Sequence, residues 1–186
     1  MTTVRPETVA DHAATRDVVA AAFGDEPIGE LLDGLRRSGA WRDLSFVAEQ
    51  EGRVVGHVSF TRGWLDAPTR LVEVLVLSPL SVHPARQGCG VGSALVRRSL
   101  GLLRGRPEPL VFLEGAPTYY GRLGFRPGGS HGFTPPSTRI PPAAFQFVDL
   151  AAYESWMTGA LVYPDVFWEH DAVGLREETA PAGRAT

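Results

Sequence analysis

The chain of 186 residues contains no lysine and only one cysteine, and each scarcity excludes a kind of chemistry. All 18 basic residues are arginine. A P-loop for nucleoside triphosphates needs a lysine after its glycines, so that motif is excluded. The single cysteine, Cys89, cannot form an internal disulfide or a multi-cysteine metal site, which is typical of a reducing compartment.

Long apolar runs and an excess of basic charge are missing as well. No stretch approaches 18 uninterrupted apolar residues, so we expect no membrane-spanning helix. The net charge of −3 argues against nonspecific binding to nucleic acid, which needs a basic surface. Residues 1–7 lack the apolar run of a signal peptide, and we therefore expect a cytoplasmic protein.

The hydrophobic content of 44% and charged content of 21% are ordinary for a globular domain with a core. We predict one domain over residues 1–176 and a disordered tail over 177–186. The order of patterns predicts an α+β fold with a mixed sheet, with residues 162–167 either an edge strand or irregular. We expect strands near residues 2–5, 45–49, 53–61, 71–82, 109–113, 125–126 and 144–150, and helices near 9–23, 28–37, 91–104 and 118–123.

The most informative segment is the glycine-rich turn that follows strand residues 80–82 and opens a helix. Gly88, Gly90 and Gly92 leave backbone N–H groups uncovered, and a helix N-terminus adds partial positive charge. The turn therefore predicts a phosphate or pyrophosphate site. A dinucleotide fingerprint fits poorly, because its glycines are spaced Gly-x-Gly-x-x-Gly and follow the first strand of the fold.

Two motifs in register resemble one family. Gln87-x-x-Gly90-x-Gly92 resembles motif A of the GNAT superfamily of N-acetyltransferases. Tyr120-x-x-x-Gly124-Phe125 resembles the pattern that follows the fifth strand of that family. The run from Glu114 to Tyr120 looks like a bacterial subgroup of predicted N-acetyltransferases, and residues 3–170 can be aligned with the fold in order.

The resemblance implies a mixed, mostly antiparallel sheet of about six to seven strands, splayed between strands 4 and 5 and flanked by about four helices. It implies an acyl-CoA-dependent N-acyltransferase without a metal. Acetyl-CoA would be the donor, and a primary amine of a small molecule or peptide would attack it directly in a ternary complex. A homodimer is possible in this family. The alternative is a GNAT-fold sensor or scaffold that binds acyl-CoA without turnover. The donor would contact Leu80, Ser81, Val82, Gln87, Gly88, Cys89, Gly90, Val91, Gly92, Ser93 and Tyr120.

Ser78-Pro79 explains how a strand becomes free to bind the pantetheine arm. Proline cannot donate to a sheet ladder and belongs at a bulge or an unpaired edge. A bulge here would splay strands 4 and 5 and leave the backbone of residues 80–82 available for pairing with the ligand. The Val82 N–H would then polarise the thioester carbonyl.

The candidate general acid is Tyr120, which would protonate the departing thiolate. The alternative is a tyrosine that only packs on the sheet, as we expect for Tyr119. The candidate general base is Glu73, which alternates on one face with Leu75 and Leu77; the alternative is a solvated carboxylate.

Further candidates have equally plain alternatives. Glu114 at a strand end is a second candidate base, or it anchors a loop. His131 lies in a Pro/Gly loop that could cover the acceptor site, or it is a surface histidine, and His83 is expected to be an exposed residue before Pro84. A water chain without a dedicated base is another route for the proton. Arg86, Arg97 and Arg98 would reach the 3′-phosphate of CoA or form a solvated face. Trp41 and Trp64 would border the acceptor groove or belong to the core, and Cys89 is expected to fill space rather than attack the donor.

Overall fold

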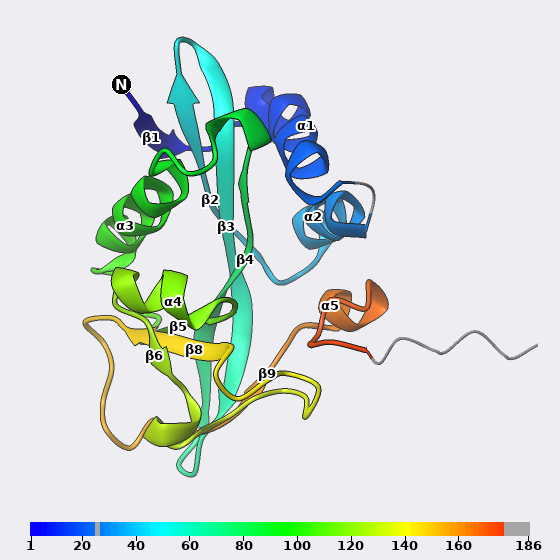
Figure 1. The fold of residues 1–186 in the computed structure, drawn as a ribbon. Helices are drawn as coiled ribbons and strands as arrows, with labels where there is room; N and C mark the ends of the chain where they lie inside the picture. The colour runs from blue at the N-terminus through cyan, green and yellow to red at the C-terminus, as the bar shows by residue number, and fades with distance from the viewer. Residues whose placement is uncertain (25–26, 177–186) are drawn as a thin grey trace, which may run out of the picture.

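The computed structural model describes residues 1–24 and 27–176, which form one nine-stranded sheet with helices on both faces (Figure 1). The main path of the sheet runs β1-β2-β3-β4-β5-β8-β6, which is the expected mixed and mostly antiparallel arrangement. The expected tail, residues 177–186, lies outside the described residues. None of the described helices is long and apolar enough to cross a membrane.

The first half of the sheet is antiparallel. It contains β1 (Thr3–Pro6), β2 (Trp41–Gln50), β3 (Arg53–Asp66) and β4 (Leu71–Val82). Glu51 and Gly52 join β2 to β3 with φ values of 51° and 74°. Two positive φ angles are what a tight hairpin turn requires, so the hairpin expected at these residues is confirmed.

The second half contains β5 (Leu110–Glu114), β6 (Arg126–Pro127) and β8 (Phe145–Asp149), with the short helix α4 (Pro117–Tyr120) between β5 and β6. Two short strands were not expected: β7 (Phe133–Thr134) and β9 (Gly159–Val162) pair with each other, and β9 also pairs with β3. The segment expected as an edge strand or irregular is the end of β9 followed by α5 (Asp165–Glu169). Short 3₁₀ turns lie at Val9–Asp11, Pro84–Arg86, Gly121–Leu123 and Gly129–His131.

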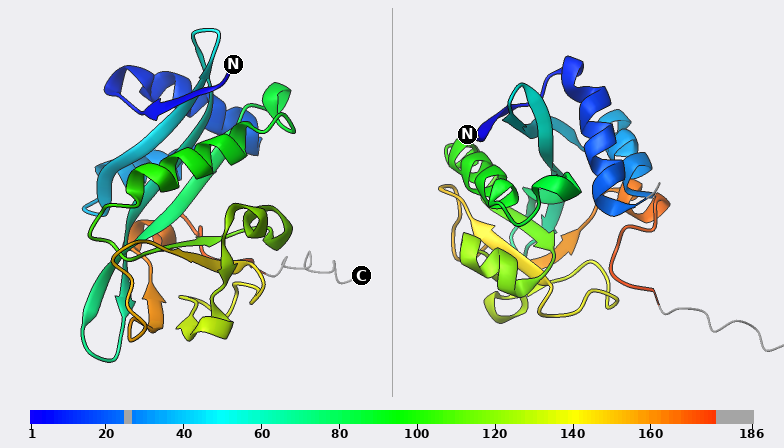
Figure 2. Two further views of the ribbon diagram at one scale, coloured as in Figure 1. Left: turned by 90° about the vertical axis from the view of Figure 1, so that its left-hand side faces the viewer. Right: turned by 45° about the horizontal axis from the view of Figure 1, so that its top comes forward.

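The helices divide between the two faces of the sheet, as Figure 2 shows. On one face α1 (His12–Phe23) and α2 (Pro27–Arg37) pack together, and Leu31 and Leu35 of α2 join a core that includes Val74 and Phe112. On the other face α3 (Val91–Leu103) contributes Val91, Leu95 and Leu103 to a second core. Successive residues of β4 and β5 alternate between these cores, as the period of a strand requires.

The sheet opens between β4 and β5. These parallel strands pair only at Leu75–Val111 and Val76–Phe112, although β4 continues to Val82. The register of β4 against β3 shifts between the pairs at Val58 and Phe60, and Ser59 Oγ donates a hydrogen bond of 2.8 Å to the Ser78 carbonyl. The bulge expected at Ser78-Pro79, and the splay between strands 4 and 5, are therefore confirmed.

A buried polar cluster ties α1 and α2 to β3. The Glu7 carboxylate accepts a hydrogen bond of 2.9 Å from Thr15 Oγ1, contacts His57 Nε2 at 3.3 Å, and forms an ion pair with Arg36. Burial alone would raise the pKa of Glu7, but the contacts with His57 and Ser45 and the charge of Arg36 lower it to about 2. Glu7 is therefore held as an anion inside the fold.

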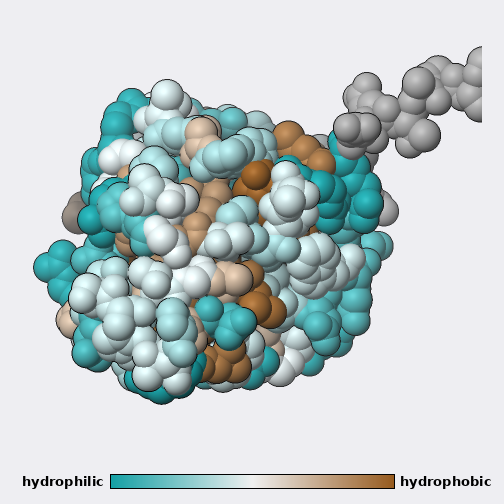
Figure 3. Space-filling view, turned by 90° about the horizontal axis from the view of Figure 1, so that it is seen from below, coloured by the Kyte–Doolittle hydropathy of each residue, from teal (hydrophilic) through white to brown (hydrophobic). Residues whose placement is uncertain are grey.

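Figure 3 shows the molecule from below, where hydrophobic residues form small areas separated by hydrophilic ones. Leu71 at the start of β4 and Val162 at the end of β9 are among the exposed large hydrophobic residues. Isolated exposed apolar side chains of this kind are normal for a folded domain.

Candidate functional site

A cleft of about 560 Å³ lies where the open end of β4 meets the N-terminus of α3. The carboxyl-terminal part of β4, the glycine-rich turn, the first turn of α3 and the segment around α4 form its walls. Of the residues expected to bind the donor, the cleft is lined by Leu80, Val82, Gln87, Gly88, Gly90, Val91, Gly92 and Ser93.

The turn adopts a backbone that glycine allows and other residues resist. Gly88 and Gly90 have φ values of 71° and 80°, and Gly90 is the N-cap of α3. A Cβ at either position would meet no atom within 4 Å, so the requirement for glycine is conformational. The α3 N-terminus therefore meets the cleft with no capping side chain at Gly90.

Gly92 is needed for a different reason, since it lies against Tyr119. A Cβ at Gly92 would come within 2.6 Å of the Tyr119 hydroxyl. Tyr119 lines the cleft, whereas Tyr120 is not among the lining residues. Tyr119, which we expected only to pack, therefore forms part of the cleft wall together with the backbone of α3.

Three arginines give the cleft a positive potential. Arg86, Arg97 and Arg122 line it, while Arg98, the next residue of α3, does not. Arg122 is oriented by a hydrogen bond of 2.9 Å from its Nε to the Thr118 carbonyl. Guanidinium groups bind phosphate well because several N–H donors point the same way.

The residues at the end of β4 alternate between the cleft and the opposite face of the sheet. Leu80 and Val82 line the cleft, whereas Ser81 is buried and pairs across the ladder with His57. Gln87 donates a hydrogen bond of 3.0 Å from Nε2 to the Val82 carbonyl, which links the strand end to the turn. Cys89 is exposed and does not line the cleft.

Tyr120 packs at the end of β5. A Cβ at Gly115 would approach the Tyr120 ring within 2.3 Å, and the ring also meets Phe125 edge-on at 5.6 Å. Burial raises the pKa of the Tyr120 phenol well above its usual range, so the hydroxyl keeps its proton at neutral pH.

Glu114 is the last residue of β5 and lies directly before Gly115. It accepts a hydrogen bond of 3.0 Å from the Gly174 N–H. Burial raises the pKa of the Glu114 carboxyl, and this effect outweighs the lowering by the Tyr163 hydroxyl and the Gly174 N–H. Glu114 is thus a carboxyl group at the mouth of the splay whose affinity for a proton is increased.

The structure does not bring Glu73 to the cleft. Glu73 is the third residue of β4, and the carboxylate forms an ion pair of 2.8 Å with Arg42. It lies beside the start of β5, with Pro107 and Glu108, while the cleft is at the other end of β4.

The histidine and tryptophan candidates also lie outside the cleft. His83 is exposed and accepts a hydrogen bond from the Ala85 N–H at 3.3 Å. His131 is exposed and stacks edge-on against Phe147 at 5.0 Å. Trp41 packs against the core beside α2, and Trp64 lines a separate, larger cavity. Within the described residues, no cluster of three or more His, Cys, Asp or Glu could hold a metal ion.

Sequence reasoning missed Tyr119, Arg122 and Leu123 as cleft residues. All three come from the segment around α4, which the Tyr120-Gly124-Phe125 motif had already marked. Adjacent residues of a helix point in different directions. Tyr119 can therefore face the cleft while the motif residue Tyr120 faces the core.

The chain matches known proteins over most of its length. The acetyltransferase (GNAT) domain family model matches residues 3–128. The N-acetyltransferase YjhQ of Escherichia coli strain K12 is 38% identical over 158 residues, which cover 80% of this chain and 84% of YjhQ.

Solved structures agree with this match. The GNAT family N-acetyltransferase YhbS from Escherichia coli, crystallised in complex with CoA, has a TM-score of 0.79 and 26% identity, covering 89% of this chain and 91% of that chain. A GNAT family acetyltransferase from Brucella melitensis, in complex with acetyl-CoA, has a TM-score of 0.72 and 32% identity, covering 90% of this chain and 98% of that chain.

The mixed sheet with its opening between β4 and β5 is thus the fold of the GNAT class, to which both solved structures belong by name. The chain belongs to the GNAT acetyltransferase family.

Proposed function

We propose that the protein transfers the acetyl group of acetyl-CoA to a primary amine of a small molecule or peptide. The observation that carries the proposal is the cleft at the open end of β4, where a strand without a partner on its β5 side, a helix N-terminus and three arginines converge. The strand suits the amides of a pantetheine arm, and the helix N-terminus and arginines suit phosphates. Two relatives of similar fold were crystallised with CoA and acetyl-CoA.

The amine nitrogen attacks the thioester carbonyl carbon directly while both substrates are bound. The carbonyl oxygen takes up negative charge, and the Val82 N–H stabilises it. The nitrogen of the tetrahedral intermediate gives its extra proton to water, the carbon–sulfur bond breaks, the thiolate takes the proton of Tyr120, and an amide and free CoA leave. Tyr120 recovers its proton from water. Support for this role is the place of Tyr120 against Tyr119, which lines the cleft, with ring centres 4.9 Å apart; its phenol is protonated at neutral pH.

We assign the removal of the amine proton to Glu114 in place of Glu73. Glu114 ends β5 at the splay, and burial raises the pKa of its carboxyl, which increases its affinity for a proton. Glu73 is engaged with Arg42 at the far end of β4. The ammonium form of the acceptor must lose a proton before attack, so the base matters most below the pKa of the amine.

The test is formation of CoA and of the acetylated amine from acetyl-CoA and a panel of primary amines. Chromatography with mass detection is preferable to a thiol reagent, because Cys89 is exposed and would react. Glu114→Gln is expected to lower kcat by about a hundredfold, and Glu73→Gln to leave kcat within about twofold of wild type.

Acetyl-CoA binding without any acetylated product across the panel would favour the non-catalytic sensor or scaffold. Equal kcat values for wild type and Glu114→Gln at every pH would remove Glu114 from the mechanism and leave the donor assignment intact.

A further inference from the structure

A second cavity, larger than the cleft beside α3, lies elsewhere in the described residues. A space of about 630 Å³ lies between the end of α2, the middle of β3, the end of β9 and α5. It shares no lining residue with the cleft. The volume is within the range of small-molecule sites.

The cavity exists because β3 changes partners. The ladder with β2 ends at the pair Trp41–Thr61, and the ladder with β9 begins at the pair Trp64–Val162. Arg62 and Gly63 lie in the notch between them, and the Arg62 N–H bonds the Ala40 carbonyl at 2.9 Å. A gap in the strand order thus opens a recess at the edge of β3, on the opposite side of that strand from β4.

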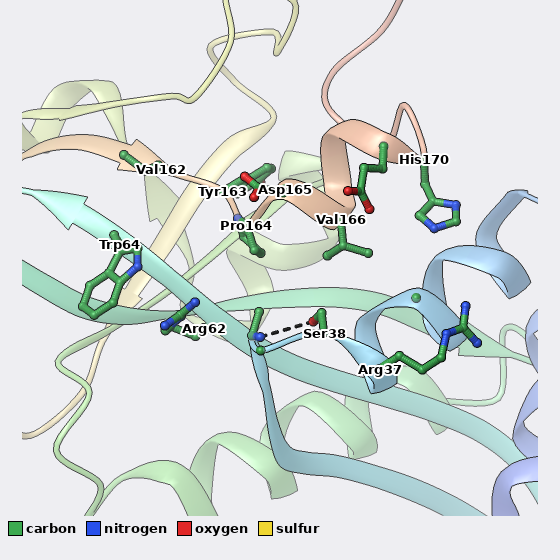
Figure 4. A pocket seen from close by; sticks show the side chains of 14 residues that line it. Arg37, Ser38, Arg62, Trp64, Val162, Tyr163, Pro164, Asp165, Val166 and His170 are labelled. Atoms are coloured by element: carbon green, nitrogen blue, oxygen red, sulfur yellow. Dashed lines mark hydrogen bonds between the residues drawn. The ribbon is translucent and has the colours of Figure 1, made fainter.

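Positive and negative groups line this recess without neutralising each other. Arg62 and Arg37 are on the β3 and α2 side, and Asp165 and Glu169 are on the α5 side. Figure 4 shows Arg62 and Arg37 on one side of the space and Asp165 across from them. Within the described residues, no ion pair within 4.0 Å involves any of these four side chains.

Arg62 is the residue that most clearly awaits a partner. It is half-buried, and its Nε–H, which is fully buried, donates no hydrogen bond within the described residues. The guanidinium lies 5.0 Å from the centre of the Trp64 ring, which holds it in the recess. A carboxylate in the recess would bind the terminal N–H groups of this half-buried guanidinium through charge-assisted hydrogen bonds.

The other walls of the recess are partly apolar and partly acidic, and they indicate which further groups a ligand should carry. Trp64, Val162, Pro164 and Val166 provide apolar surface, while Asp165 and Glu169 are exposed at the rim. We propose that this recess binds a small zwitterion: a carboxylate on Arg62, an apolar body against Trp64, and an ammonium toward the acidic rim. The chemical class is that of a free amino acid. The site requires no acetyl-CoA, so this inference is independent of the acyltransfer proposal.

The test uses three probes of nearly the same shape. L-phenylalanine has both charges, 3-phenylpropionate lacks the amine, and 2-phenylethylamine lacks the carboxylate. The readout is the indole N–H resonance of Trp64 in a ¹⁵N–¹H correlation spectrum, assigned with Trp64→Phe. L-phenylalanine is expected to give a saturable shift, and each of the other two to bind about tenfold more weakly.

Two variants localise the binding. Arg62→Gln is expected to bind L-phenylalanine and 2-phenylethylamine with similar affinity, because the partner of the carboxylate is gone. Arg62→Lys keeps the charge but loses the planar fork, so its affinity for L-phenylalanine should lie between those of Arg62→Gln and wild type. The matched control is Arg70→Gln. Arg70 also stacks on a tryptophan, Trp156 at 5.2 Å, but it lies in another pocket beside Glu73 and Glu108, so this variant should bind like wild type.

The dispersion of each spectrum reports whether a variant is folded. The inference is overturned if the Trp64 resonance shows no saturable shift up to the solubility limit of L-phenylalanine. It is also overturned if the two single-charge probes bind as tightly as L-phenylalanine. The same holds if Arg62→Gln and Arg62→Lys are both folded and both bind L-phenylalanine with the affinity of wild type.

Discussion

Tyr119 and Tyr120 are neighbours in α4, yet their side chains meet different surroundings. Tyr119 lies in the cleft wall with its hydroxyl next to Gly92, while the Tyr120 ring packs against Gly115 and Phe125. Burial raises the pKa of the Tyr120 phenol well above its usual range. The two hydroxyls can therefore be tested separately.

Tyr120→Phe is expected to lower kcat by about a hundredfold, because it removes the proton offered to the thiolate. The KM for acetyl-CoA should change little, since the ring and its packing remain. Tyr119→Phe is the control, and it should alter KM rather than kcat because its hydroxyl lines the donor cleft. Initial rates with one reactive amine measure both constants, and unchanged turnover in Tyr120→Phe would exclude the acid role.

Glu7 makes stability depend on pH. Its folded pKa is about 2, below the ordinary value of 4.5, so the anionic form favours the folded state. The contribution is on the order of 3 kcal/mol; it is fully present above about pH 4.5 and is lost as the pH falls toward 2. Glu7→Gln should therefore destabilise the protein at pH 7 and lose most of that deficit by pH 3.

Urea unfolding of wild type and Glu7→Gln at several pH values measures this difference. Glu30→Gln on the exposed side of α2 is the control, and it should differ from wild type by less than about 0.5 kcal/mol at every pH. A deficit in Glu7→Gln that stays constant from pH 7 to pH 3 would contradict the linkage to Glu7 ionisation.

At the level of elements, the bulge in β4 is held by one side-chain hydrogen bond. Ser59→Ala removes the Ser59 Oγ donor to the Ser78 carbonyl. We expect a loss of about 1 kcal/mol in the free energy of unfolding. We also expect acetyl-CoA to bind about fivefold more weakly, because the strand end that would pair with it is less well held. Calorimetric titration and chemical unfolding measure the two effects.

Ser99→Ala is the matched control. Ser99 is also a buried serine that donates at 2.8 Å to a carbonyl, that of Leu95, but both residues lie inside α3. The carbonyl of a residue inside a helix already accepts the N–H four residues later, so this substitution should leave both quantities nearly unchanged. Similar losses of affinity in both variants would show that the Ser59 bond is not specific to the bulge.

The elements that could be predicted from the sequence are those with a local signal. Pro79 marked the bulge because proline has no N–H for a ladder, and the Glu51-Gly52 pair marked the hairpin. β9 has four residues and its partner β7 has two, and their pairing depends on closure of a long chain segment. α5 follows β9 after only two residues, so an apolar run across both elements has no clear period.

At the scale of the molecule, a ligand that binds only the folded state raises the melting temperature. At a concentration of acetyl-CoA about 100 times its Kd, the stabilisation is about 2.7 kcal/mol, which corresponds to roughly 5–10 °C for a chain of this length. A thermal melt by circular dichroism measures the shift. ATP and NAD at the same concentration should raise the melting temperature less than acetyl-CoA does. An equal shift with either nucleotide would indicate a general nucleotide site.

The fold as a whole could be predicted because two motifs lie at the right separation in one domain. The donor cleft is built largely from one continuous segment, residues 80–93, so most of its lining residues can be recognised from one local sequence pattern. The larger cavity is assembled from α2, β3, β9 and α5, which are far apart in the sequence. The gap between β2 and β9, which both pair with β3, has no local sequence pattern that would predict it.

In the part of the chain that the structure describes, β4 and β5 are joined by two parallel pairs only, Leu75–Val111 and Val76–Phe112. Backbone amides of residues 77–82 that point away from β3 have no ladder partner on the β5 side. They should exchange their hydrogens with solvent faster than the amides of Leu75 and Val76. A bound thioester would pair with these amides in the place of a neighbouring strand. Hydrogen exchange that slows only at residues 77–82 when acetyl-CoA is added would show that the ligand has joined the sheet.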